Sequence, residues 1–285
     1  MTLATMLIFP NTREAIQDKI MEWIEAKYQS GTGPLVMWVK GPAGIGKTAI
    51  AGSIAERCDV KGYLMASFFF SRFDPNRDDA SHLVATIAYQ MALNIQGCYE
   101  DLVTVVDRDP LIFQKALDVQ FTSLIVSPLR RLMESGCDKY SGAPHVIVMD
   151  GLDECKDPKF QVRILDMFAN LLPQCPFPIR LLVASRPERH LAAAFEISPV
   201  GNITTELDLK PQFSLYDDIR VYFVVKFNTI KTTHQDKKNI PSTWPKFQTL
   251  TSSHTNHRAS LSMRPPLSNI LHPSITTQSN DSRIF

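Results

Sequence analysis

Residues 35–48 read Leu-Val-Met-Trp-Val-Lys-Gly-Pro-Ala-Gly-Ile-Gly-Lys-Thr, and this stretch is the most specific indication of the fold in the chain. Its first part, Leu35–Val39, is a short apolar run that follows turn residues, which is typical of a buried parallel strand. Its second part, Gly41–Thr48, fits the phosphate-loop pattern G-x-x-x-x-G-K-[ST]. A helical pattern over Ala49–Arg57 comes directly after the loop. A strand before this pattern and a helix after it are the context in which it indicates nucleotide binding.

The residue types in the loop suit a phosphate ligand. Three glycines let the backbone curl so that its N–H groups converge on the phosphates, and the helix N-terminus adds a positive dipole. Lys47 supplies a positive charge for the β- and γ-phosphates, and the Thr48 hydroxyl can ligate Mg²⁺. The alternative is a glycine turn that precedes a lysine by chance. The predicted nucleotide-binding residues are Gly41, Pro42, Ala43, Gly44, Ile45, Gly46, Lys47 and Thr48.

A second apolar run, His145–Met149, ends in an acidic sequence, Asp150-Gly151-Leu152-Asp153-Glu154. A carboxylate at the carboxyl end of a parallel strand points into the crevice where ligands bind. We therefore expect Asp150 to hold Mg²⁺, directly or through water. Glu154 or Asp153 can orient a water molecule for attack on the γ-phosphate. The alternative is an acidic loop that only caps the following helix.

A third run, Ile179–Ala184, ends in Ser185-Arg186-Pro187. A cationic strand tip at this edge of the sheet can sense the γ-phosphate. The alternative is a surface arginine at a strand–helix turn, with Pro187 starting the helix.

The whole chain alternates between strand-like and helical patterns, which predicts an α/β protein with a mostly parallel sheet. The further strands are expected at 64–71 and 203–209. The further helices are expected at 12–28, 80–94, 113–134 and 161–172.

Composition limits the kinds of partner. The 285 residues include 30 basic and 29 acidic side chains, which argues against a nucleic-acid binder. No apolar stretch reaches roughly 18 residues, so a membrane span is not expected. The apolar start of the chain lacks the basic region of a signal peptide. The five cysteines contain no C-x-x-C, which favours reduced thiols in a cytoplasmic protein.

Three segments carry a resemblance to a known family. Trp38–Ala51, Val146–Cys155 and Leu181–Leu191 resemble the NACHT domains of STAND-class signalling NTPases, in particular the fungal group of the nephrocystin 3-like N-terminal type. The likeness covers roughly residues 9–245. It implies a P-loop NTPase three-layer sandwich with five strands in the order 5-1-4-3-2.

The resemblance also implies roles for site residues. Lys47 and Thr48 bind phosphate and Mg²⁺, Asp150 serves the metal, Glu154 or Asp153 serves hydrolysis, and Arg186 is the sensor. Proteins of this class are nucleotide-dependent switches with slow hydrolysis. For this chain the expected nucleotide is ATP, with GTP as the alternative. Two other functions remain open: a turnover NTPase coupled to oligomerisation, and a nucleotide-binding fragment without switching.

The resemblance divides the chain into four parts: a lead-in helix (1–30), the NTPase core (31–210), the start of a helical region (211–245) and a tail (246–285). Full members carry an N-terminal effector and a C-terminal sensor, through which self-association or partner proteins are expected. We expect neither within these 285 residues.

The tail differs from the rest of the chain in composition. Residues 246–285 contain 13 Ser or Thr, no Gly and the single acidic residue Asp281. Such a segment is predicted to be disordered. However, allowed codons for Leu261–His272, read in a shifted frame, can encode I-Y-A-S-T-V-I-K-Y-I, which is similar to the family's continuation. We therefore expect an out-of-frame read after Pro245, with a genuine disordered tail as the alternative.

Overall fold

Five parallel strands form the centre of the computed structural model, which describes residues 13–26, 33–136, 143–177, 179–209 and 232–233. In chain order they are β1 (Val36–Lys40), β2 (Leu64–Phe69), β3 (His145–Asp150), β4 (Ile179–Ser185) and β5 (Thr204–Asp208). Their order across the sheet is β2-β3-β4-β1-β5, and every pairing is parallel. The predicted α/β class and the strand order 5-1-4-3-2, counted from the other edge, are confirmed.

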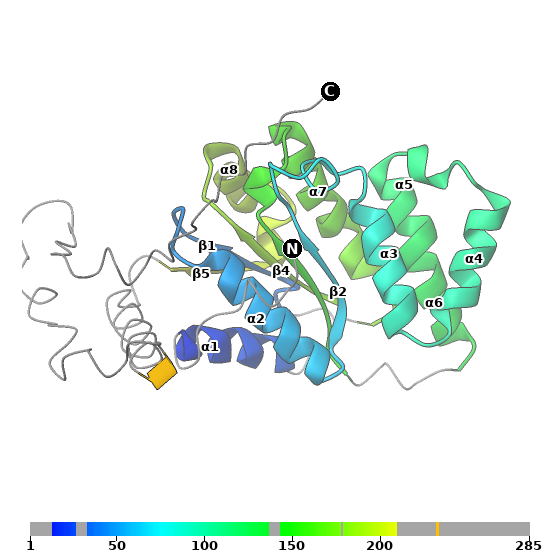
Figure 1. Ribbon diagram of the computed structural model, residues 1–285. Helices are drawn as coiled ribbons and strands as arrows, with labels where there is room; N and C mark the ends of the chain where they lie inside the picture. Colours follow the sequence, from blue (N-terminus) through cyan, green and yellow to red (C-terminus); the bar gives the residue numbers. More distant parts are fainter. Residues whose placement is uncertain (1–12, 27–32, 137–142, 178, 210–231, 234–285) are drawn as a thin grey trace, which may run out of the picture. The chain divides into compact units, whose positions relative to one another are not determined.

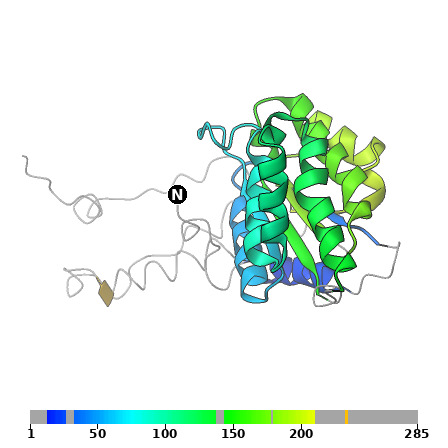
Figure 2. The ribbon, with the colours of Figure 1, turned by 90° about the vertical axis from the view of Figure 1, so that its right-hand side faces the viewer.

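Helices cover both faces of the sheet and make a three-layer sandwich (Figures 1 and 2). One face carries α1 (Glu14–Glu25) and α2 (Lys47–Val60). The other face carries α3 (Leu83–Asn94), α5 (Leu117–Phe121), α6 (Ser127–Glu134), α7 (Pro158–Leu171) and α8 (Arg189–Ile197). A further helix, α4 (Cys98–Arg108), packs on α3 and α6. Short 3-10 turns lie at Ile112–Gln114, Leu152–Glu154, Leu172–Gln174 and Gly201–Ile203.

Alternate side chains of each strand pack into two separate core clusters, one on each face of the sheet. Val36 and Trp38 of β1 enter the cluster with α3 and α7, whereas Met37 and Val39 enter the cluster with α1 and α2. Successive residues of a strand point to opposite faces. A strand buried on both faces must therefore be apolar at every position, and this is why the run at 35–39 is continuous rather than alternating.

The predicted helix at 113–134 is interrupted, which corrects the sequence analysis. The segment consists of a 3-10 turn, α5, a π-helix (Thr122–Val126) and α6. Pro128 at the start of α6 has no N–H to donate and its ring would clash with the carbonyl of Leu124 in a regular α-helix. The wider π turn, closed by the Ser127 N–H on the Thr122 carbonyl, removes that conflict.

The chain divides into two units, 1–228 and 229–285. In the second unit the description covers only Thr232 and Thr233, which are helical. The predicted tail, and the predicted region 211–245 apart from those two threonines, lie outside the described residues. Within the described ranges, no helix has the length and apolar character needed to cross a membrane.

Candidate nucleotide-binding site

The phosphate loop lies between the end of β1 and the start of α2, as predicted. Gly44 has φ 76° and Gly46 has φ 94°, values that L side chains rarely adopt. At Gly41 the constraint is space, because a Cβ there would lie 3.0 Å from Cγ2 of Ile45. Pro42, Ala43 and Gly44 are exposed, so the curled backbone faces solvent. The helix dipole of α2, a helix of 14 residues, adds positive potential at this point.

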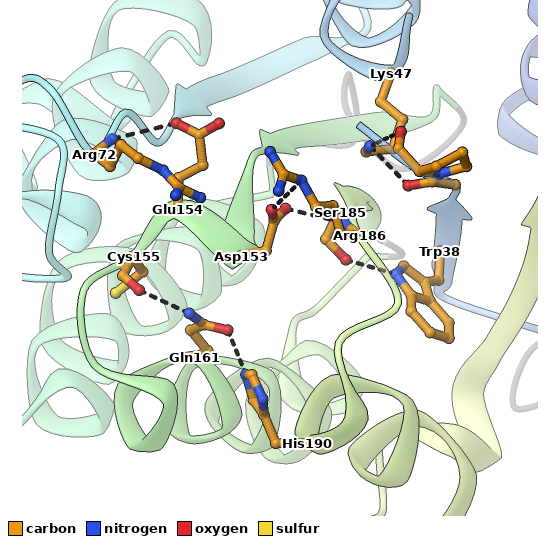
Figure 3. A network of polar contacts seen from close by, with 12 residues as sticks. Trp38, Lys47, Arg72, Asp153, Glu154, Cys155, Gln161, Ser185, Arg186 and His190 are labelled. Atoms are coloured by element: carbon orange, nitrogen blue, oxygen red, sulfur yellow. Dashed lines mark hydrogen bonds and ion pairs between the residues drawn. The ribbon is translucent and has the colours of Figure 1, made fainter. Parts of the chain in front are cut away.

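The Lys47 ammonium group lies against the backbone of the phosphate loop. Its Nζ donates to the carbonyl of Gly41 at 2.9 Å and to the carbonyl of Pro42 at 3.0 Å (Figure 3). Burial lowers the pKa of Lys47 from its ordinary value, while the charges of Asp153 and Asp150 oppose that shift. The ammonium group is therefore held beside the loop by weak, neutral acceptors, which an anionic ligand can replace.

Asp150 ends β3 and its carboxylate is buried, with 3% of the residue exposed. Its Oδ1 has no hydrogen-bond partner among the described residues. Burial raises the pKa of Asp150 to about 6, although a hydrogen bond with Thr48 and the charge of Lys47 oppose the rise. The structure thus brings together Thr48, Lys47 and Asp150, which the sequence separates by about a hundred residues.

These groups fit a hard divalent cation. Mg²⁺ prefers oxygen ligands and is usually bound by one or two protein oxygens together with phosphate oxygens and water. An unpartnered carboxylate oxygen beside a hydroxyl, next to the loop predicted to bind phosphate, offers that set. Over the described ranges, no group of three or more His, Cys, Asp and Glu side chains could hold a metal ion.

Asp153 and Arg186 bind each other. The Arg186 backbone N–H donates to Oδ1 of Asp153 at 3.0 Å, and Nε lies 3.3 Å from Oδ2 (Figure 3). Only 5% of the Asp153 side chain is exposed, against 37% for Arg186. Both predicted site residues therefore lie at the carboxyl edge of the sheet, and both oxygens of Asp153 have a partner.

Glu154 follows Asp153 in the 3-10 turn after Gly151, and its Oε2 accepts the backbone N–H of Arg72 at 3.2 Å. In Figure 3 a dashed line joins its carboxylate to Arg72. Gly151 has φ 70°, and a Cβ there would lie 3.1 Å from the Phe70 carbonyl. Glycine is thus required where the chain turns beneath the end of β2.

Sequence reasoning missed several residues that touch these motifs. The Arg13 guanidinium donates to the Ile45 carbonyl of the phosphate loop at 3.2 Å. The Trp38 indole N–H donates to the buried Ser185 hydroxyl at 2.9 Å. No spacing signal could have found either contact, because each joins residues far apart in the chain. Arg77, in the loop after β2, binds the Asp74 carboxylate and the Phe69 carbonyl.

The sandwich and its loop define an α/β protein of the P-loop NTPase type. A family model described as nephrocystin 3, N-terminal, matches residues 12–186, and the chain belongs to this family. The matched range contains the phosphate loop, the acidic turn after β3 and Arg186. It confirms the part of the resemblance that concerns the nephrocystin 3-like N-terminal type. No curated protein matches the chain.

Proposed function

We propose that this chain is a NACHT-type switch of the STAND class that binds ATP or GTP with Mg²⁺ and hydrolyses it slowly. The observation that carries the proposal is the buried, unpartnered Oδ1 of Asp150 beside Thr48 and the phosphate loop. A buried carboxylate oxygen without a partner is costly, and a bound cation is the group that would remove that cost.

The roles follow from the contacts. The N–H groups at the start of α2 would bind the phosphates, and Lys47 would exchange two carbonyl partners for phosphate oxygens. Thr48 and Asp150 would hold Mg²⁺, which when bound neutralises phosphate charge. Asp153 is fully engaged by Arg186, so Glu154 is the better candidate to orient water. Arg186 would act as the sensor by moving between Asp153 and the γ-phosphate.

We place the protein in the cytoplasm. Cys58, Cys98, Cys155 and Cys175 are free thiols, which suits a reducing compartment. As a member of a switch class, it is expected to associate with itself or with partner proteins rather than with nucleic acid or membrane.

The switch is tested by comparing the ADP form with a form loaded with a non-hydrolysable ATP analogue. Analytical ultracentrifugation should show larger species only with the triphosphate analogue, and phosphate release from ATP should be slow, below about one turnover per minute. Rapid turnover that rises with assembly would favour a turnover NTPase. Binding of both nucleotides without any change in association would favour a fragment that does not switch.

A further inference from the structure

The acidic turn after β3 is held by a buried glutamine. The turn is closed by the Glu154 N–H on the Gly151 carbonyl at 2.7 Å and by the Cys155 N–H on the Leu152 carbonyl at 3.2 Å. Cys155 follows the 3-10 turn with an extended backbone (φ −62°, ψ 128°), so its carbonyl group lies outside the helical turn. Gln161 of α7 donates its Nε2 to that carbonyl at 2.7 Å (Figure 3). Gln161 is 3% exposed, so this bond is made away from water.

The direction of the Gln161 amide is fixed by chemistry. The Cys155 carbonyl can only accept, so the Gln161 nitrogen must face it. Oε1 of Gln161 then faces Nε2 of His190 at 2.6 Å, and His190 must carry a hydrogen on Nε2. A neutral His190 of that tautomer and a charged His190 both donate there. The contact between Gln161 and His190 is therefore kept in either charge state.

His190 lies in α8, four residues after Arg186. The segment Arg186–His190 thus holds the acidic turn at two points. Arg186 binds Asp153 directly, and His190 binds Cys155 through Gln161. Glu154 lies between Asp153 and Cys155. The Arg186 backbone N–H stays on Asp153 when the guanidinium moves to the γ-phosphate, so a link remains on each side of Glu154 and restricts where its carboxylate can go.

We propose that Gln161 and His190 are positioning residues for hydrolysis of the bound nucleoside triphosphate. This inference rests on the proposed function. Neither side chain is assigned contact with nucleotide. Their effect is to fix the backbone of 153–155, and through it the reach of Glu154. Loss of the link should lower the rate of the chemical step and leave nucleotide affinity unchanged, because the phosphate loop and Asp150 do not depend on it.

The test uses the full chain and two measurements. The variants are Gln161→Leu, His190→Ala and His190→Gln, of which the last keeps an N–H donor. The control is Gln174→Leu, since Gln174 also donates to a backbone carbonyl, that of Asn170, but at an exposed site beyond the end of α7. Hydrogen–deuterium exchange of residues 151–157 without nucleotide measures how firmly the turn is held. Single-turnover phosphate release and the Kd for nucleotide measure chemistry and binding separately.

We expect Gln161→Leu and His190→Ala to exchange faster over 151–157 and to hydrolyse about five- to tenfold more slowly, with Kd changed less than about twofold. His190→Gln and Gln174→Leu should behave as the wild type. Unchanged exchange or unchanged hydrolysis in His190→Ala would overturn the inference, and so would a parallel loss of affinity in a folded variant. If the wild type binds no nucleotide, the proposed function fails first and the positioning role fails with it, whatever the exchange data show.

Discussion

Asp150 is the residue at which burial and charge conflict most directly. Burial raises its pKa to about 6 from the ordinary 3.8, since a carboxylate that leaves water loses its hydration. The Thr48 hydroxyl and the Lys47 charge favour the ionised form, whereas Asp153 and Glu154 disfavour it. Between pH 3.8 and about pH 6 the folded chain binds more protons at Asp150 than the unfolded chain does. The free energy of unfolding therefore decreases as pH rises through this window.

Replacing Asp150 by Asn should remove this penalty. At pH 7 we expect Asp150→Asn to be more stable than the wild type by about 3 kcal/mol without ligand, and the difference should vanish below about pH 3. Urea unfolding at several pH values measures it. The same variant should lose the Mg²⁺ dependence of nucleotide binding. A variant that is less stable than the wild type at pH 7 would contradict this account of Asp150.

At the scale of the element, the phosphate loop and α2 depend on glycine for backbone shape. Gly46 precedes α2 with φ 94°, and Gly62 follows it with φ 71°. A Cβ at either position would meet no atom within 4 Å, so the cost of an alanine is conformational rather than steric. Both substitutions should thus cost about 1–2 kcal/mol of stability.

The two ends of α2 provide a matched pair of variants. Gly46→Ala and Gly62→Ala should both lower the free energy of unfolding, but only Gly46→Ala should weaken nucleotide binding, because its loop must regain the curl in order to bind phosphate. Where the free loop relaxes out of the curl, each 1.4 kcal/mol needed to regain it weakens the Kd about tenfold. Chemical unfolding and nucleotide titration of both variants test this. Equal affinities in the two variants would mean that the curl of the loop is not what binds phosphate.

Local patterns predicted most elements, and their failures have physical reasons. Four strands were found because each contains a short apolar run between turn residues, whereas β5, with Leu207 as its one apolar residue, was expected from alternation over 203–209. Helix α4 was missed, since only Cys98 in it is buried and Leu102, Val105 and Val106 are half-buried against the core. The break before Pro128 was missed because the apolar spacing continues through the π turn.

Of the candidate site, only the residues that lie within a local sequence motif could be predicted. Lys47, Thr48 and Asp150 were expected because their chemistry is local to a strand end. Strand order came from family resemblance, since no local pattern contains it. The pairing of Asp153 with Arg186 and the link through Gln161 depend on how β3 and β4 align, so neither could be read from spacing.

At the scale of the molecule, the lead-in helix α1 belongs to the folded core. Ile16, Ile20 and Ile24 are fully buried and share a cluster with Ile50 and Ile54 of α2. The guanidinium of Arg180, at the start of β4, donates to the Ala26 carbonyl just after α1 at 2.6 Å. Because α2 begins at the phosphate loop, α1 supports the element on which the nucleotide would bind.

Ile20→Ala tests whether α1 is structural. Truncating a fully buried isoleucine should cost about 2–5 kcal/mol through lost transfer energy and the cavity that remains. The neighbouring exposed Lys19, changed to alanine, should have almost no effect. Thermal or chemical unfolding compares the two. A loss below about 1 kcal/mol for Ile20→Ala would show that α1 contributes little to the fold.

Mg²⁺-dependent nucleotide binding by the full chain, measured by isothermal titration calorimetry with ATP and with GTP, tests the proposed site directly. The wild type and Lys61→Ala, an exposed lysine at the other end of α2 that pairs with Glu25, should bind one nucleotide each. Lys47→Ala should bind at least about a hundredfold more weakly, because the phosphates lose their charged donor. Chelation of Mg²⁺ should also weaken binding. A folded wild type that binds neither nucleotide, or a Lys47→Ala variant that binds as tightly as the wild type, would contradict the account.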